Sequence, residues 1–97
     1  HKIADMSARV DRLDGWLNQI CWLADQGEMP VAQICKAKFS ATKDLEFCAS
    51  EAMQILGGAG YLRGNPVERF YREVKVMAIG GGSEEIMRDL AVRQMGL

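Results

Sequence analysis

Two glycine-rich segments hold the residues of this sequence whose types and spacing could do chemistry. The first is GGAG at 57–60, and the second is GGG at 80–82, followed directly by a helix start, SEE, at 83–85. Glycine lets a ligand approach the backbone, and the free N–H groups at a helix N-terminus favour an anion such as a phosphate. Glycine also ends helices and permits tight helix–helix turns without any ligand. Spacing alone does not decide between these interpretations.

Neither glycine segment matches an established phosphate-binding motif. No lysine follows the glycines as in the P-loop, and no predicted strand precedes them as in the dinucleotide fingerprint. His1 is the only histidine and lies at a chain end, where it is a poor candidate for a ligand. The intervals between Cys21, Cys35 and Cys48 suit neither a disulfide framework nor a CxxC metal clamp. We therefore predict no metal site, and we predict that the cysteines are reduced and buried as small hydrophobes.

The composition indicates one small globular domain with a thin core. Of the 97 residues, 48% are hydrophobic and 26% charged, and a chain of this size buries only about 60–65% of its unfolded surface. The net charge of −1, with both signs scattered along the chain, argues against nucleic acid or an acidic membrane as a partner. No apolar run is long enough for a bilayer, and nothing resembles a signal peptide. We expect a location in the cytoplasm or, for a eukaryotic source, in the mitochondrial matrix.

Apolar residues recur in steps of three and four, and this period predicts an all-α fold with four long helices. The first begins near residue 3 and breaks at 26–30, and the second spans about 30–56. NPVE at 65–68 and GSEE at 82–85 predict the two remaining helix starts, with Asn65 and Ser83 as the capping residues. We therefore predict that residues 1–97 form one up-down four-helix bundle.

The predicted bundle has a defined set of inward-facing side chains. They are Ile3, Met6, Val10, Leu13, Leu17, Ile20 and Ala24 in the first helix, Val31, Ile34, Ala41, Leu45, Cys48, Ala52 and Ile55 in the second, Val67, Phe70, Tyr71, Val74, Met77 and Ala78 in the third, and Ile86, Met87, Leu90 and Ala91 in the fourth. Because the chain begins without methionine and in the middle of a helical pattern, we expect it to be a piece of a longer protein.

Four segments, in order and covering nearly the whole chain, resemble the C-terminal helical domain of the acyl-CoA dehydrogenase family. They are HKIADM at 1–6, CKAKFSAT at 35–42, QILGGAGYLRGNPVERFYREVKV at 54–76 and GGGSEEIMRDLAVRQ at 80–94. The pattern Gln-x-x-Gly-Gly-x-Gly-Tyr, followed by Pro-Val-Glu-Arg and then Gly-x-x-Glu-Ile, is specific. The resemblance implies a flavoenzyme with an N-terminal helical domain, a middle β domain and a C-terminal four-helix bundle, of which this chain is similar only to the last.

The resemblance implies that both glycine segments serve FAD bound between subunits of a dimer or tetramer. The implied cofactor-contacting residues are Gln54, Ile55, Leu56, Gly57 and Gly58 in the first segment and Ser83, Glu84 and Glu85 in the second. The implied substrate is an acyl-CoA thioester, contacted at Gly81 and Gly82. The two glutamates also suit a simpler role as partners of the helix dipole, and we do not assign either of them as a catalytic base.

Gly81 departs from one branch of this family, which keeps its catalytic glutamate at the corresponding place in the turn. Glycine cannot take a proton. Isovaleryl-CoA and long-chain acyl-CoA dehydrogenases carry the base on an earlier helix, and resemblance to them would place it before His1, with Gly81 leaving room for a branched or bulky acyl chain. We therefore expect no catalytic residue in 1–97 and no activity from the chain alone. A member that has lost dehydrogenation, or a free-standing helical interaction module, is the alternative.

Overall fold

The computed structural model describes all residues from 1 to 97, and it contains helices and no strand. The elements are α1 (Lys2–Asp25), α2 (Val31–Leu56), α3 (Gly58–Tyr61), α4 (Pro66–Ile79) and α5 (Glu84–Gln94). The all-α prediction is confirmed, and the four long helices begin at or next to the predicted residues. None of these helices combines the length and apolar character that a membrane crossing requires.

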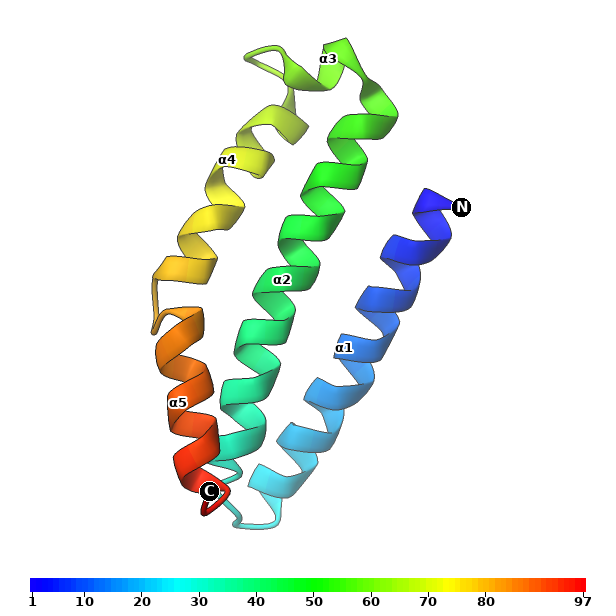
Figure 1. Ribbon diagram of the computed structural model, residues 1–97. Helices are drawn as coiled ribbons and strands as arrows, with labels where there is room; N and C mark the ends of the chain where they lie inside the picture. The colour runs from blue at the N-terminus through cyan, green and yellow to red at the C-terminus, as the bar shows by residue number, and fades with distance from the viewer.

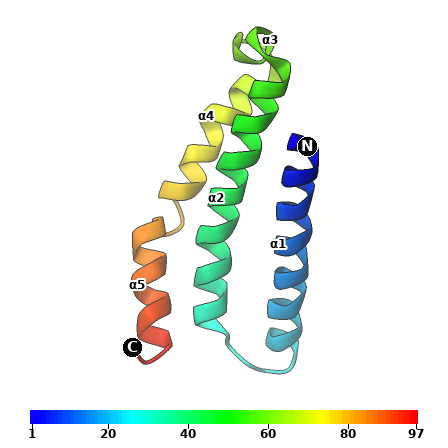
Figure 2. The same ribbon diagram turned by 45° about the vertical axis from the view of Figure 1, so that its right-hand side comes forward.

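Helix α2 occupies the middle of the molecule, and each of the other helices packs against it. Figures 1 and 2 show α1 along one side of α2 and α4 and α5 along the other. The direction of the chain alternates between α1, α2 and α4, but α5 continues in the direction of α4, so these two lie end to end (Figure 1). The result is an elongated body with principal extents of 47 × 24 × 21 Å.

The starts of α4 and α5 follow from local capping chemistry. The Asn65 side chain accepts a hydrogen bond from the Val67 N–H at 2.9 Å, and Pro66 takes the first helical position, where its missing N–H costs nothing. The Ser83 hydroxyl accepts from the Ile86 N–H at 3.3 Å. Both predicted caps are therefore confirmed.

The short helix α3 was not predicted, since GGAG reads as a loop. Gly57, with φ of 61°, ends α2, and the chain then makes one helical turn against the end of α2. Gly60 is buried there, and a Cβ on it would lie 2.9 Å from the Leu56 Cβ and 3.1 Å from the Met53 carbonyl oxygen. The close approach of two backbones, and not only a turn, explains this glycine.

The core is thin, with 11 of 97 residues buried. Small side chains dominate it because they let neighbouring backbones approach α2 closely. The buried apolar residues are Ile20, Cys35, Ala37, Ala49, Val74, Ala78 and Ala91. Three buried polar residues, Thr42, Asp44 and Glu84, take part in contacts between helices.

The predicted inward stripe of α1 is only half correct. Met6, Leu13 and Ile20 are buried or half-buried, whereas Ile3, Val10 and Leu17 are exposed by 70, 59 and 44%. A wide apolar stripe needs more than one neighbour, and the principal neighbour of α1 is α2 alone. The same correction applies to Ala24, Ile34, Ile55, Phe70, Tyr71, Met77 and Ile86, which are also exposed. We call the exposed residues Ile3, Val10 and Leu17 the α1 stripe.

The cysteine prediction is also only partly correct. All three cysteines are free thiols, with Cys35 buried, Cys48 half-buried and Cys21 exposed. Burial raises the pKa of the Cys48 thiol, and the charge of Asp44 adds to this effect against the opposing influence of Arg9. Cys21 is exposed because it follows Ile20 on α1, one step beyond the face that meets α2.

Charged side chains join α1 to α2 beside the narrow apolar contact that Met6, Leu13 and Ile20 provide. The buried Asp44 of α2 accepts hydrogen bonds from Arg9 at 2.6 Å and from Arg12 at 2.9 and 3.1 Å. The Arg9 guanidinium also lies over the Phe47 ring, 3.8 Å from its centroid. Towards the start of α1, Lys2 pairs with Glu51 of α2.

Candidate functional site

The turn between α4 and α5 is the most distinctive backbone feature of the molecule. Gly81 and Gly82 have φ of 68° and 95°, values that glycine adopts freely and that other residues rarely adopt. The Gly80 N–H still donates to the Val76 carbonyl at 2.7 Å, as in a continuing helix. The two glycines after it therefore end α4 before α5 begins.

The N–H groups of Gly81 and Gly82 have no hydrogen-bond acceptor within the chain. No backbone carbonyl accepts from them, and the only backbone N–H groups that donate to side chains belong to Val67 and Ile86. A backbone N–H without an internal partner is available to water or to a ligand. The turn thus offers two adjacent donors just before the N-terminus of α5.

An apolar groove of about 670 Å³ lies beside this turn. Its lining consists of Lys38, Ala41, Thr42 and Leu45 from α2, Val76 and Met77 from α4, and Gly80 and Gly81 from the turn. No carboxylate lines the groove. Its size and apolar lining are typical of sites that take a small apolar group. Of the two predicted substrate-contacting residues, Gly81 lines the groove, whereas Gly82 follows it in the chain and is not part of the lining.

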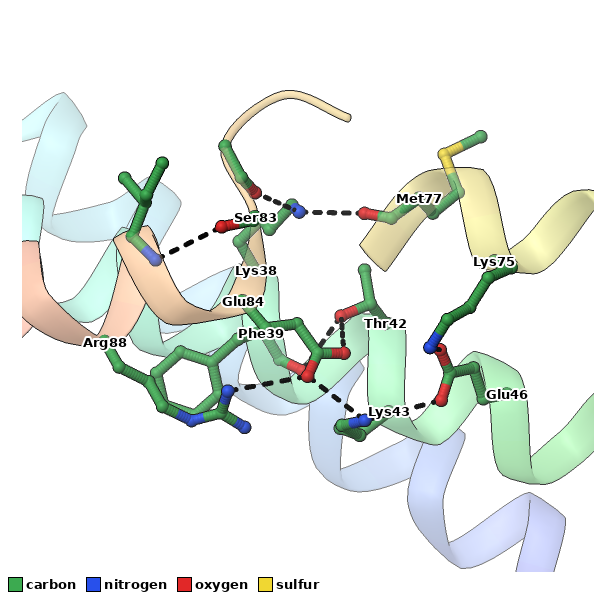
Figure 3. A network of polar contacts seen from close by, with 12 residues as sticks. Lys38, Phe39, Thr42, Lys43, Glu46, Lys75, Met77, Ser83, Glu84 and Arg88 are labelled. Carbon is green, nitrogen blue, oxygen red and sulfur yellow. Dashed lines mark hydrogen bonds and ion pairs between the residues drawn. The ribbon is translucent and has the colours of Figure 1, made fainter. Parts of the chain in front are cut away.

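Lys38 reaches from α2 to both ends of the turn, as Figure 3 shows. Its ammonium donates to the carbonyl oxygen of Met77 at 2.8 Å and to that of Gly82 at 2.6 Å. The last carbonyl groups of a helix lack internal partners and attract a cation. The sequence pattern assigns no role to Lys38. The one available signal was that it has no acidic residue three or four positions away with which to pair.

Glu84 faces the bundle rather than the solvent (Figure 3). Its carboxylate lies 3.1 Å from the Lys43 ammonium, 3.3 Å from the Thr42 hydroxyl and 3.4 Å from the Arg88 guanidinium. Arg88 in turn lies over the Phe39 ring, 4.6 Å from its centroid. This cluster fixes the start of α5 on α2, and it leaves the Glu84 carboxylate occupied by internal partners.

Ser83 and Glu85, on either side of Glu84 in the sequence, do not join this cluster. The Ser83 hydroxyl is engaged as the cap of α5, whereas Glu85 is exposed and makes no ion pair. Any ligand at this helix start would therefore meet backbone N–H groups and the Glu85 side chain rather than the carboxylate of Glu84.

The first glycine segment lies at the other end of α4 (Figure 1). Gln54, Ile55 and Leu56 form the exposed end of α2, and open space surrounds the positions that a Cβ would take at Gly57 and Gly58. Helix α4 has 14 residues, which corresponds to about 21 Å at 1.5 Å per residue. The structure therefore separates the eight predicted cofactor residues into two groups instead of bringing them together.

A larger hollow of about 780 Å³ lies at the start of α4 and contains none of the predicted site residues. Two of its three arginines are paired along α4, Arg69 with Glu73 at 2.8 Å and Arg72 with Glu68 at 2.6 Å. We therefore favour the groove at the glycine turn as the functional site. The chain has no cluster of three or more histidine, cysteine or acidic side chains that could hold a metal.

Comparisons with known proteins match almost the full chain to one family. A family model described as the C-terminal domain of acyl-CoA dehydrogenase matches residues 1–96. The chain is 38% identical over 95 residues to the acyl-[acyl-carrier-protein] dehydrogenase MbtN of Mycolicibacterium paratuberculosis, covering 97% of this chain and 24% of that protein. It is 34% identical over 94 residues to the probable acyl-CoA dehydrogenase YngJ of Bacillus subtilis, covering 97% of this chain and 25% of that protein.

A solved structure shows the same fold. The crystal structure of a probable acyl-CoA dehydrogenase from Mycobacterium abscessus matches with a TM-score of 0.93 and 35% sequence identity, over 99% of this chain and 26% of that chain. The chain thus spans about a quarter of the length of these relatives.

Proposed function

Because the chain belongs to the acyl-CoA dehydrogenase family, as its C-terminal domain, we propose that it serves the flavin-dependent α,β-dehydrogenation of an acyl-CoA thioester. The observation that carries this proposal is the turn at 80–82, which lines an apolar groove through Gly80 and Gly81 and contains two adjacent N–H groups without an acceptor in the chain. The chain is a quarter of the length of its relatives, so the complete reaction belongs to the longer protein that the proposal assumes.

The groove and the turn suit the two halves of an acyl thioester. The apolar groove would take the acyl chain, while the unpaired N–H groups of Gly81, in its wall, and Gly82, next in the chain, would donate to the thioester carbonyl. Donors aimed at a carbonyl oxygen stabilise the negative charge that develops when the neighbouring carbon loses a proton. The lack of a side chain at Gly81 leaves room for a branched or bulky acyl group.

We propose that a group outside residues 1–97 takes the proton. No carboxylate lines the groove, and Glu84 is held by Lys43, Thr42 and Arg88. A general base needs to lie within hydrogen-bond reach of the proton it removes. The proposal therefore places the base on an earlier helix of the longer protein, at a distance in sequence from this turn.

The residues present fit FAD at two separate places. The open glycines Gly57 and Gly58, with Gln54, Ile55 and Leu56 before them, would contact the adenine side of a flavin nucleotide held by a neighbouring subunit. The start of α5, from Ser83 to Glu85, would lie near FAD through its N–H groups, with Glu84 contributing backbone rather than carboxylate. When bound, FAD supplies the acceptor for the hydride from the β-carbon.

The exposed α1 stripe supports assembly with other protein surface. We propose a homo-oligomer, a dimer or tetramer, in which α1 is covered by the remaining domains or by another subunit. We place the protein in the bacterial cytoplasm or, for a eukaryotic source, in the mitochondrial matrix.

The test is anaerobic mixing of the purified flavoprotein with acyl thioesters while the absorbance of the flavin is followed. Straight-chain and branched acyl-CoA substrates are compared with the same acyl groups on acyl carrier protein, since one relative is named for that carrier. We expect rapid bleaching of bound FAD by an acyl-CoA. Bound FAD that no acyl-CoA reduces would contradict the proposal, and reduction by the carrier-protein substrates alone would correct the substrate class.

A helical interaction module without flavin is the second candidate, and the α1 stripe favours it equally. The two functions differ in what purifies with the protein. A protein that contains no flavin, binds none when FAD is added, and holds a stable partner through α1 would support the module over the enzyme.

A further inference from the structure

The ammonium of Lys38 holds the two ends of the glycine turn together. Met77 lies in the last turn of α4, and Gly82 directly precedes the cap of α5, yet both carbonyl oxygens accept from the same lysine, at 2.8 and 2.6 Å (Figure 3). The ion pairs of the structure involve the neighbouring Lys43 and Lys75 but not Lys38. The charge of Lys38 is therefore directed at backbone carbonyl groups alone.

Apart from Lys38, few contacts hold this turn, and the main one is the Met87 side chain, which packs against Gly82 where a Cβ would clash with it. The last helical bond of α4 is the one from Gly80 to Val76, and the Ser83 cap belongs to α5. Gly81 and Gly82 between them have positive φ and no Cβ that could restrict the backbone. A glycine turn with so few contacts is expected to sample several conformations unless its ends are held.

We propose that Lys38 is a positioning residue for the acyl thioester, an inference that rests on the proposed function. Because the peptide unit is planar, fixing the Gly82 carbonyl also fixes the N–H of Ser83 at the start of α5, and the bond to the Met77 carbonyl anchors the end of α4. With both ends held, the backbone between them has fewer accessible conformations. This segment carries the unpaired N–H groups of Gly81 and Gly82, and it lies beside the groove whose wall includes Gly81 and Lys38 itself.

The variants Lys38→Met and Lys36→Met test this role in the flavoprotein. Methionine keeps an unbranched stem but removes the charge and the donors, and Lys36 is a matched control on the same helix with no hydrogen bond or ion pair. For Lys38→Met we expect bound FAD, an unchanged helical content, and flavin reduction about 10- to 100-fold slower at saturating acyl-CoA, as for a misplaced reacting group. The affinity for acyl-CoA should change far less than the rate.

Lys38→Arg gives a second variant that retains a charged donor, and we expect it to recover part of the rate. Hydrogen exchange measured by mass spectrometry on the segment 77–84 gives a readout independent of activity. Exchange should accelerate in Lys38→Met and stay unchanged in Lys36→Met. Equal exchange in the two methionine variants, or equal rates of flavin reduction, would overturn the inference.

A failure of the proposed function has a different signature. In that case the unmodified protein would not be reduced by any acyl thioester, while the exchange of segment 77–84 would still respond to Lys38→Met. Faster exchange in Lys38→Met with an unchanged rate of flavin reduction would show that Lys38 holds the turn but does not serve the reaction, which overturns the positioning role.

Discussion

The carboxylate of Glu84 lies 3.1 Å from the ammonium of Lys43, although one residue begins α5 and the other lies in the middle of α2. Burial of Glu84 raises the pKa of its carboxyl, but the hydrogen bond and charge of Lys43, with the hydrogen bonds from Arg88 and Thr42, lower it by more. The pKa of Glu84 is therefore below its ordinary value of 4.5. This carboxylate stabilises the fold in its ionised form.

The lowered pKa of Glu84 makes the stability of the protein depend on pH. A carboxyl with a lower pKa in the folded state adds stability that is complete above its unfolded pKa and is lost as pH falls through the folded pKa. We expect the free energy of unfolding to decrease below about pH 4.5, and Glu84→Gln to lose this part of the dependence. At pH 7, Glu84→Gln should cost about 1–2 kcal/mol. Urea unfolding at a series of pH values measures both, with the exposed Glu85→Gln as the control.

Asp44 should be the most sensitive position in the contact between α1 and α2. Asp44→Asn removes the charge that accepts from Arg9 and Arg12, and we expect a loss of about 1.5–3 kcal/mol in the free energy of unfolding. Asp11→Asn, an exposed change on α1 without an ion-pair partner, is the control. Denaturant unfolding that gives the same midpoint for both variants would show that the arginines do not hold α1.

Two glycine-to-alanine substitutions should have opposite effects. At Gly60 a Cβ would lie 2.9 Å from the Leu56 Cβ, so Gly60→Ala should destabilise the fold by about 1–3 kcal/mol. At Gly15, inside α1, the added Cβ meets nothing within 4 Å, and Gly15→Ala should stabilise by about 0.5–1 kcal/mol. In thermal unfolding, the midpoint temperature should be lower for Gly60→Ala and higher for Gly15→Ala than for the unmodified chain. A stabilised Gly60→Ala variant would contradict the close approach of α3 to α2.

A side chain at Gly81 would have two effects, strain in the backbone and loss of space for the acyl chain, and two substitutions distinguish them. An alanine at φ of 68° is strained, so Gly81→Ala should lose about 1 kcal/mol of stability even without a ligand. Gly81→Asn adds a larger side chain with less backbone strain, because asparagine tolerates this region. In the longer flavoprotein that the proposed function assumes, we expect both variants to retain flavin reduction by short acyl-CoA substrates and to lose it with long or branched ones. Loss of flavin reduction with every acyl chain, while FAD stays bound, would show that Gly81 serves more than pocket volume.

The α1 stripe should control the association of the chain. Because Val10 and Leu17 are exposed, the double change Val10→Gln with Leu17→Gln should reduce self-association of the chain while its stability changes little. Leu13→Gln, which faces α2, should instead destabilise the fold by about 2–3 kcal/mol. Sedimentation velocity combined with thermal unfolding distinguishes these outcomes. Unchanged association in the double variant would place the contact on another surface.

Local chemistry explains which parts of the fold could be predicted from the sequence. The caps at Asn65 and Ser83 act within three residues of themselves, so their pattern alone was sufficient. The exposure of Ile3 and Val10 was not predictable, because periodicity identifies an apolar face but not the neighbour that covers it. The end-to-end order of α4 and α5 likewise depends on packing against α2.

The candidate site shows the same limit. The glycine positions of the turn could be identified from the sequence, but the contacts of Lys38 span 39 and 44 residues and end on backbone oxygens, which no side-chain pattern reveals. Glu84 was predicted to be a first-turn partner of the helix dipole, and its position at the start of α5 agrees with that. Its direction towards Lys43 required the packed structure.

Because α2 lies in the centre of the molecule, the helices should differ in their stability against local unfolding. Helix α1 contacts α2 through charged pairs and a narrow set of apolar residues, and α4 and α5 each pack on α2 from the opposite side. Any one of these helices can detach while the others remain, but α2 loses its cover only when all have left. Protection of backbone amides should therefore be greatest in the middle of α2 and lowest in α1, so that partial unfolding begins at the amino-terminal end.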